Sequence, residues 1–310
     1  MIAVTGATGY VGRRLVKTLI GEGERVRCLV RAGADTSIFQ RLSIDMVQGD
    51  VGHLSSLKAA CVGVDSVVHL VAIIREEGLS TFDDVNYQGT RNLMNAIQES
   101  SVKRFILLSA IGAQPNPRYP YLHSKWLGEQ AVVTGDIPYT IIRPSIMFGR
   151  GDEFINAVAA SVKWGPVAPI IGSGKTKLQP IFADDVAKCI SLTLKNPQLV
   201  GRVIEIGGPQ QLSYRELVEI VLRTCKLKRV MIHLPVFLIR PVSKLMGCLV
   251  PYPPITPTLL NMLDVDNVAE VDSVKKYFQF DPIPIDGNIG YILGMNKKDA
   301  FIISLGLKPA

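Results

Sequence analysis

A glycine-rich turn near the start of the chain constrains the fold more than any other stretch. Residues 2–4 form a short apolar run typical of a buried strand, and residues 13–20 repeat apolar side chains at helical spacing. Gly6, Gly9 and Gly12 lie between them at intervals of three residues. A strand, a glycine turn and a helix in this order place a helix N-terminus at the carboxyl edge of a sheet. Its free N–H groups and positive dipole end can hold a pyrophosphate there.

Each glycine has a separate role in this interpretation. Gly6 permits the tight turn, Gly9 lets the backbone approach the phosphates, and Gly12 lets the helix pack closely on the strand. The triplet alone would also fit an ordinary strand-to-helix turn, but the strand before it and the helix after it favour dinucleotide binding. The residues expected to line this part of the site are Thr5, Gly6, Thr8, Gly9, Tyr10, Val11 and Gly12.

Strands and helices continue to alternate after this turn. Further strands are expected at residues 24–31, 45–50, 64–72, 103–110, 137–144 and 201–208, and helices at 85–96, from 119 onward and at 184–194. This alternation predicts an α/β fold of the Rossmann type, a doubly wound parallel sheet with helices on both faces. We expect a nucleotide-binding domain over residues 1–145, completed by 181–208. Residues 146–180 and 209–310 would form a smaller, mostly helical C-terminal lobe that binds substrate or a partner.

The strand ends supply further candidate cofactor contacts. Where the second strand ends, an NAD-specific site usually has an Asp or Glu for the ribose 2′-OH, but this chain has Arg31. A guanidinium suits the 2′-phosphate of NADP, so NADP is the expected cofactor, with NAD as the alternative. An exposed loop arginine is the other explanation. The third strand ends at Asp50, which could meet the adenine amino group, and the fourth should end along the cofactor. These positions add Arg31, Asp50, Val51, Leu70, Val71 and Ala72 to the expected site.

Tyr121 and Lys125 are the best candidates for chemistry. They lie four residues apart at the start of an expected helix, so both point from one face. A nearby ammonium would stabilise a phenolate and lower the tyrosine pKa, and such a tyrosine can exchange a proton with a substrate oxygen. Ser109, at the end of the fifth strand, could hydrogen-bond the same oxygen. A surface Tyr–Lys pair is the alternative, but the position just after the fifth strand favours a catalytic site.

The order of these features resembles the extended, atypical branch of the short-chain dehydrogenase/reductase superfamily. The matching pieces are the glycine turn, Asn86, Gly89, Thr90, Ser109, Tyr121, Lys125, Arg143, Pro144 and residues 185–187. Within that epimerase/dehydratase-like branch, residues 121–129, 206–209 and 254–267 are similar to the NAD(P)H-binding accessory subunit of respiratory complex I and its bacterial relatives. The resemblance implies a tightly held NADP(H) or NAD(H) and a catalytic triad of Tyr121, Lys125 and Ser109. It adds Asn86, Lys125, Pro144 and Ile146 to the expected cofactor contacts.

Composition excludes several other classes of protein. The five cysteines have no CxxC spacing, so neither a zinc site nor a disulfide framework is expected. The net charge of +7 is spread without a basic run, which argues against nucleic acid as a partner. No signal peptide is recognisable before the first strand, and no apolar stretch reaches about 18 residues, so a cytoplasmic protein without a transmembrane helix is expected.

Residues 230–250 leave two functions open. This stretch is apolar but carries Arg240 and Lys244, and Pro235 and Pro241 would start, kink or divide any helix. It could be an ordinary helix packed on the protein, or a peripheral contact with a membrane or a membrane complex. The first function is therefore an oxidoreductase or epimerase that works by hydride transfer on a small molecule that the sequence does not identify. The alternative is a non-catalytic, nucleotide-binding accessory or assembly protein of a respiratory or other membrane complex.

Overall fold

The computed structural model describes residues 1–98 and 100–308, and it divides the chain into two compact units. The first unit contains Met1–Pro144 and Ala183–Glu205, and the second contains Ser145–Phe182 and the chain from Ile206 onward. Each unit has its own hydrophobic core and is described by itself.

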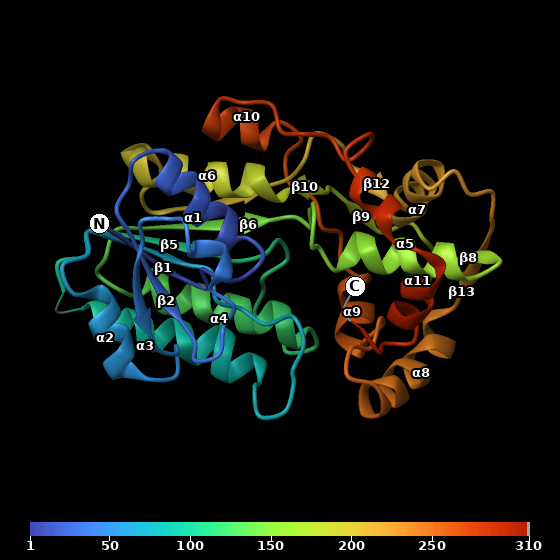
Figure 1. Ribbon diagram of the computed structural model, residues 1–310, viewed down its shortest axis with the longest axis horizontal. Helices are drawn as coiled ribbons and strands as arrows, with labels where there is room; N and C mark the ends of the chain where they lie inside the picture. The colour runs from blue at the N-terminus through green and yellow to red at the C-terminus, as the bar shows by residue number, and fades with distance from the viewer. Residues whose placement is uncertain (99, 309–310) are drawn as a thin grey trace. The chain divides into compact units, whose positions relative to one another are not determined.

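A seven-stranded sheet forms the centre of the first unit (Figure 1). Its strands are β1 (Ile2–Thr5), β2 (Val26–Val30), β3 (Asp45–Gln48), β4 (Ser66–His69), β5 (Arg104–Leu108), β6 (Tyr139–Pro144) and β11 (Arg202–Ile206). Their spatial order is β11-β6-β5-β4-β1-β2-β3. The chain thus builds outward from β1 in one direction and then, from β4, in the other, so the strand order reverses between β1 and β4. Nucleotides bind at this switch point in open parallel sheets.

Helices cover both faces of this sheet (Figure 1). α1 and α6 pack together on one face, while α2, α3 and α4 lie on the other. Their bounds are α1 (Gly12–Gly21), α2 (Leu54–Cys61), α3 (Gly89–Ile97), α4 (Pro120–Val133) and α6 (Ala183–Lys195). A π-helix, η2 (Asp83–Gln88), leads into α3, and the short 3-10 turns η1 (Ser37–Phe39) and η3 (Pro197–Leu199) lie in connections. This architecture confirms the predicted Rossmann-type α/β fold.

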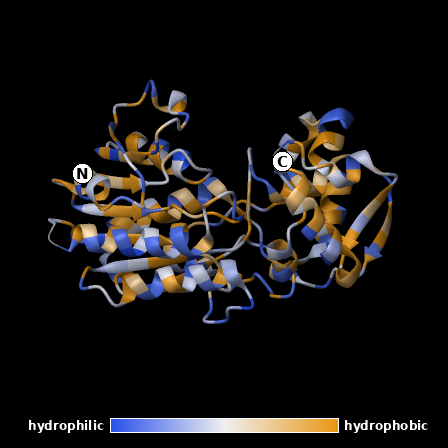
Figure 2. Ribbon diagram, turned by 90° about the horizontal axis from the view of Figure 1, so that it is seen from below, coloured by the Kyte–Doolittle hydropathy of each residue, from blue (hydrophilic) through white to orange (hydrophobic). Residues whose placement is uncertain are grey.

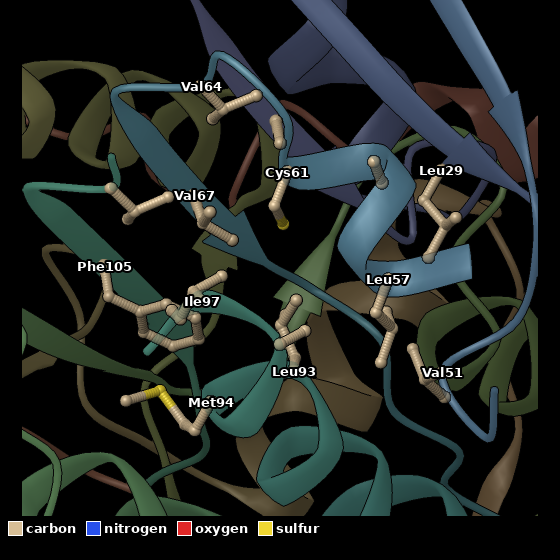
Figure 3. Packing of buried hydrophobic residues seen from close by; sticks show 14 of the residues in the cluster. Leu29, Val51, Leu57, Cys61, Val64, Val67, Leu93, Met94, Ile97 and Phe105 are labelled. Carbon is tan, nitrogen blue, oxygen red and sulfur yellow. The ribbon is translucent and has the colours of Figure 1, made fainter. Parts of the chain in front are cut away.

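The core on the α2–α3 face explains why the strands are apolar. Figure 3 shows Leu57 and Cys61 of α2 and Leu93 and Ile97 of α3 in one buried cluster with Phe105 of β5. All five side chains are at most 2% exposed. The strands themselves carry mostly the orange of hydrophobic residues in Figure 2, as expected for a sheet buried on both faces.

The second unit combines short two-stranded sheets with helices. The paired strands are β7 (Met147–Phe148) with β10 (Ile181–Phe182), β9 (Lys177–Leu178) with β12 (Leu212–Ser213), and β8 (Val167–Ile171) with β13 (Val230–Leu234). The helices are α5 (Phe154–Trp164), α7 (Tyr214–Thr224), α8 (Val236–Leu249), α9 (Pro257–Met262), α10 (Ser273–Phe278) and α11 (Lys297–Ser304), with a 3-10 turn, η4 (Gly290–Gly294). A core of its own holds α5, α7 and β8 together.

Three differences from the sequence-based expectations concern local structure. The helix expected over 85–96 begins as the π-helix η2 and becomes α-helical only at Gly89. Residues 146–180, for which no individual helix or strand was predicted, contain an eleven-residue helix, α5, and the strand β8. The apolar stretch 230–250 contains strand β13 before helix α8, with Pro235 as the N-cap between them. Apolar residues can form either element, and here the pairing of β13 with β8 decides.

Candidate functional site

The glycine turn has the geometry that a phosphate-binding loop needs. Gly6 has a φ of +74°, a backbone conformation that residues with a side chain disfavour. The turn is closed by a hydrogen bond of 3.0 Å from the Gly9 N–H to the Gly6 carbonyl. A Cβ on Gly12 would lie 2.0 Å from the Gly6 oxygen and 2.7 Å from Cα of Ala7. α1 can therefore begin here only with glycine at position 12.

The N-terminus of α1 is available to an anion. Its N-cap residue, Val11, makes no side-chain capping hydrogen bond, and the first turn contains no acidic residue. Gly9 is exposed, whereas Thr8 and Tyr10 are half-buried. With no acidic residue in this turn and no side-chain cap, the dipole of this helix end favours a bound phosphate.

The candidate adenosine residues lie after β2 and β3. Arg31 follows β2 directly and is exposed. Asp50 is half-buried and accepts a hydrogen bond from the Gly52 N–H at 2.8 Å, while the following Val51 is buried in the core. The structure thus leaves the Arg31 side chain open to a ligand and gives the Asp50 carboxylate a backbone partner.

Asn86 organises the loop that follows β4. Its Oδ1 accepts from the Ile73 N–H at 2.8 Å, and its Nδ2 donates to the Ile73 carbonyl at 3.1 Å and to Ser124 Oγ at 3.0 Å. Asn86 is 1% exposed, so its amide binds the protein itself. It fixes the chain immediately after Leu70, Val71 and Ala72, of which the first two are half-buried and the third is exposed.

A buried polar chain that the sequence interpretation did not include runs beside this loop. Thr5 Oγ1 lies 2.6 Å from His69 Nδ1, and His69 Nε2 lies 3.1 Å from Thr90 Oγ1, which donates to the Asn86 carbonyl at 2.7 Å. Because the Thr90 proton is already used, His69 Nε2 carries the ring proton and Thr5 donates to Nδ1. Burial, aided by the Lys125 charge, lowers the pKa of His69 to about 3, so the ring stays neutral. The Thr5 hydroxyl therefore points into the protein, where its hydrogen bond to His69 joins β1 to β4.

Ser109 and Lys125 meet at the carboxyl end of β5. Lys125 is 4% exposed, and its Nζ donates to the carbonyl of Leu108 over 2.8 Å. Ser109 is the next residue, and its Oγ, buried, has no hydrogen-bond partner among the described residues. Burial lowers the pKa of Lys125 to about 8, and Glu129 partly offsets this. An unpaired buried hydroxyl beside a buried ammonium is costly unless a ligand completes it.

Tyr121 lies one turn before Lys125 on α4 and is 8% exposed. Its ring contacts Phe82 edge-on at 5.9 Å between centroids. Its carbonyl accepts from Ser124 Oγ at 2.8 Å, which links α4 to Asn86. Burial raises the pKa of Tyr121 to about 12, opposite to the lowering expected from the neighbouring ammonium. The effect of desolvation on the pKa of Tyr121 outweighs the effect of the neighbouring ammonium, because Lys125 donates to the Leu108 carbonyl instead.

Two expected cofactor contacts lie at the end of β6 and just after it. Pro144 is the last residue of β6 and is buried, with its carbonyl accepting from the Ile111 N–H at 3.1 Å. Ile146 belongs to the second unit, where its N–H donates to Asn267 Oδ1 at 2.8 Å. The Ile146 carbonyl accepts from the Ile181 N–H at 2.9 Å, so both of its backbone groups have partners in that unit.

These residues fit a nicotinamide dinucleotide. The glycine turn leads into a helix start without a side-chain cap, which suits a phosphate, and the buried Ser109 hydroxyl without a partner among the described residues suits a polar ligand atom. A model of the NAD dependent epimerase/dehydratase family matches residues 2–207. The chain belongs to this family. The resemblance to short-chain dehydrogenases/reductases and the predicted NAD(P)-binding class are confirmed.

Individual relatives of this epimerase/dehydratase chain have different names. It is 29% identical over 300 residues to the NADH dehydrogenase [ubiquinone] 1 alpha subcomplex subunit 9 of Arabidopsis thaliana, covering 91% of this chain and 73% of that one. It is 31% identical over 199 residues to the ceramide reductase of Caulobacter vibrioides, covering 64% of this chain and 62% of that one. The structure of the UDP-glucuronic acid 4-epimerase from Bacillus cereus shares the fold, with a TM-score of 0.72 at 18% identity over 97% of this chain and 99% of that one.

The subgroup named from the sequence is represented among these relatives. A complex I subunit is among the relatives, and its similarity reaches into both units of this chain. In the described part of the chain, each helix is too short or too polar to serve as a transmembrane segment.

Proposed function

We propose that the chain is an NADP(H)-dependent oxidoreductase or epimerase that acts on an alcohol or carbonyl group. The observation that carries this proposal is the buried, unpaired Ser109 hydroxyl next to the Lys125–Leu108 hydrogen bond. An unpaired buried hydroxyl is unfavourable in a purely structural contact between a helix and a strand, whereas a substrate oxygen could form the hydrogen bond that this hydroxyl lacks. The bound nucleotide would supply or accept the hydride.

Three side chains would divide the remaining work. Tyr121, with its pKa raised by burial, is a neutral phenol at neutral pH and is suited to give a proton to a carbonyl oxygen during reduction. Ser109 would donate a hydrogen bond to the same oxygen. Lys125 is held at the end of β5, where it would hold the nicotinamide ribose and favour the phenolate that remains on Tyr121.

The preference for NADP(H) is a separate proposal that depends on Arg31. Its exposed guanidinium lies immediately after β2, where a carboxylate would repel a 2′-phosphate. Calorimetric titration should give tighter binding of NADP(H) than of NAD(H), and Arg31→Asp should erase or invert the order. Arg202→Asp makes the same charge change on β11, the edge strand farthest from β2, and should leave the order intact. Equal affinities in the wild type would end this proposal.

The catalytic assignment is tested with Tyr121→Phe. NADPH consumption should be screened against a panel of aldehydes, ketones and nucleotide sugars. The variant should lower kcat by about a hundred to ten thousand fold while the Kd for NADPH stays the same, because only the proton donor is removed. Tyr119→Phe removes a hydroxyl just before α4 and should have no such effect. A Tyr121→Phe protein with wild-type kcat would refute the role.

A second function is favoured by one specific finding. The similarity to the complex I subunit covers 91% of this chain and therefore extends beyond the catalytic unit. The alternative is accordingly a nucleotide-binding accessory protein of a membrane complex that contacts it through residues 230–250. A wild-type protein that retains bound NADP(H) but turns over none of the panel would favour this alternative.

A further inference from the structure

Helix α8 turns its apolar side outward. Ser243 alone among its residues is fully buried, while Phe237 is 73% exposed, Leu245 60% and Leu249 70%. Leu238 and Val242 are also at least half exposed. At 100° per residue these five side chains fall within one arc of about 140° around the helix axis. An amphipathic helix normally buries such an arc, so this face is organised to be covered.

The orientation of α8 is fixed by contacts at both ends. At its start, β13 pairs with β8 in parallel, and the Gly172 N–H donates to the Leu234 carbonyl at 2.9 Å. After its end, the Tyr252 N–H donates to the Gly306 carbonyl at 2.9 Å, and α9 packs on α8. The outward arc is therefore a consequence of how the second unit folds, and the helix cannot simply roll its apolar face inward.

The chain from the end of α7 to the end of α9 carries charge of one sign. Residues 220–263 contain six Lys and Arg residues and no Asp or Glu. One of the six, Arg223, is paired with Asp286 across 2.7 Å. Arg240 and Lys244 project from one flank of the apolar arc, next to one another at a spacing of four residues. An apolar strip with a basic flank is the pattern of helices that lie in the plane of an anionic membrane surface.

We propose that α8 docks this chain on an anionic lipid surface, with the apolar arc in the headgroup boundary and Arg240 and Lys244 among the headgroups. A second copy of the chain is a poor occupant, because a two-fold contact would bring both basic flanks together. Pro241 supports a shallow position: it has no N–H to give to the Phe237 carbonyl, and that carbonyl needs water or headgroup donors. The proposal goes beyond the hydride-transfer function and does not depend on it.

Liposome flotation tests the proposal without any turnover measurement. The full chain should float with vesicles of phosphatidylcholine and phosphatidylglycerol, much less with phosphatidylcholine alone, and less at high salt. Phe237→Asp with Leu245→Asp should weaken binding at least about tenfold, since each removes an apolar side chain that would be buried in the headgroup boundary. Lys244→Gln and Arg240→Gln should each weaken it about fivefold. Matched controls are Leu79→Asp, at a 97% exposed leucine of the first unit, and Lys17→Gln on α1, both with wild-type binding.

Several results would overturn the proposal. These are a failure to bind either vesicle, equal binding to neutral and anionic vesicles, or full binding by the Phe237–Leu245 double variant. Sedimentation at rising protein concentration tests whether a second copy of the chain covers the α8 face instead. A dimer that forms without vesicles and is lost in the double variant would make the α8 face an interface between copies. Circular dichroism of each variant checks that these exposed substitutions leave the fold intact.

Discussion

Two strand–turn–helix segments of this chain place their apolar side chains in opposite ways. After β1, helix α1 buries Leu15, Val16 and Leu19 completely and exposes Arg13 and Lys17. After β13, helix α8 does the reverse: Phe237 and Leu249 are mostly exposed, and the fully buried residue is a serine. Both helices are amphipathic, so amphipathic sequence alone does not decide which side is covered.

The difference lies in what each strand belongs to. β1 is an inner strand of a seven-stranded sheet, paired with β2 and β4, and the glycine turn folds α1 directly back onto that sheet. β13 pairs only with β8 in a two-stranded sheet, and α8 leaves it through Pro235. A sheet of two strands offers little area to cover a fourteen-residue helix. The comparison teaches that periodicity shows which face needs a partner, while topology decides whether the chain itself supplies one.

The largest expected difference comes from one substitution made on each helix. Leu15→Ala removes a fully buried side chain and should lower the free energy of unfolding by about 2–5 kcal/mol, because it leaves a cavity against the sheet. Leu245→Ala should change it by less than about 0.5 kcal/mol in solution, because that side chain is 60% exposed. Urea titrations of both variants measure this. Similar losses for the two would show that the outer face of α8 is covered in solution.

A second prediction concerns the buried ammonium in the first unit. In the unfolded chain Lys125 binds its proton below about pH 10.5, whereas burial lowers its pKa to about 8 in the fold. Between these values the unfolded state holds more protons, so this group makes stability rise with pH. The loss of stability caused by burying the Lys125 ammonium is fully present below pH 8. Relative to Lys125→Met, the wild type should gain up to about 3 kcal/mol from pH 8 to 10.5.

The control for this effect is Lys244→Met on α8, which makes the same substitution at an exposed lysine. Urea unfolding at several pH values gives the comparison. A constant difference between wild type and Lys125→Met across this range would mean that Lys125 keeps its ordinary proton affinity in the fold, and that the buried Lys125–Leu108 contact opens to water.

The first unit could be predicted from the sequence because its signals are local. The strand, the three glycines and the start of the helix follow one another within the first twelve residues. Only glycine fits at position 12, because a Cβ there would clash with backbone atoms of Gly6 and Ala7. The inner strands β1, β4 and β5 are almost completely buried, so their apolar runs were recognisable one by one. The Tyr121–Lys125 spacing was equally local, since i and i+4 always share a helix face.

The remaining features depended on contacts between distant residues. The chain from Thr5 through His69 to Thr90 joins three elements, and no motif marks such a set of hydrogen bonds. The pKa of Tyr121 was expected to fall, but Lys125 donates to the carbonyl of Leu108 at the end of β5, and burial raises the pKa of Tyr121 instead. β13 could not be told from the start of α8, because a short apolar run fits either until its partner strand is known.

A smaller effect is expected at the glycine turn itself. Gly12→Ala places a Cβ 2.0 Å from the Gly6 oxygen and 2.7 Å from Cα of Ala7. Both are backbone atoms, so neither can rotate away as a side chain could. Overpacking of this kind costs about 1–3 kcal/mol. The turn must also shift, so the affinity for NADP(H) should fall together with the stability. Urea unfolding and nucleotide titration measure the two effects, and a variant with wild-type values in both would contradict the assignment of this turn.

The smallest effect should have the opposite sign. Gly247 lies in the last turn of α8, and a Cβ there would meet nothing within 4 Å. Because alanine loses less backbone entropy than glycine in a helix, Gly247→Ala should raise the free energy of unfolding by about 0.5–1 kcal/mol. Thermal and urea unfolding can both resolve this gain. Gly247 lies on the side of α8 next to Lys244 and away from the apolar arc, so vesicle flotation should be unchanged. A loss of stability would instead mean that another part of the chain covers this side of α8, and the contrast with α1 would then disappear.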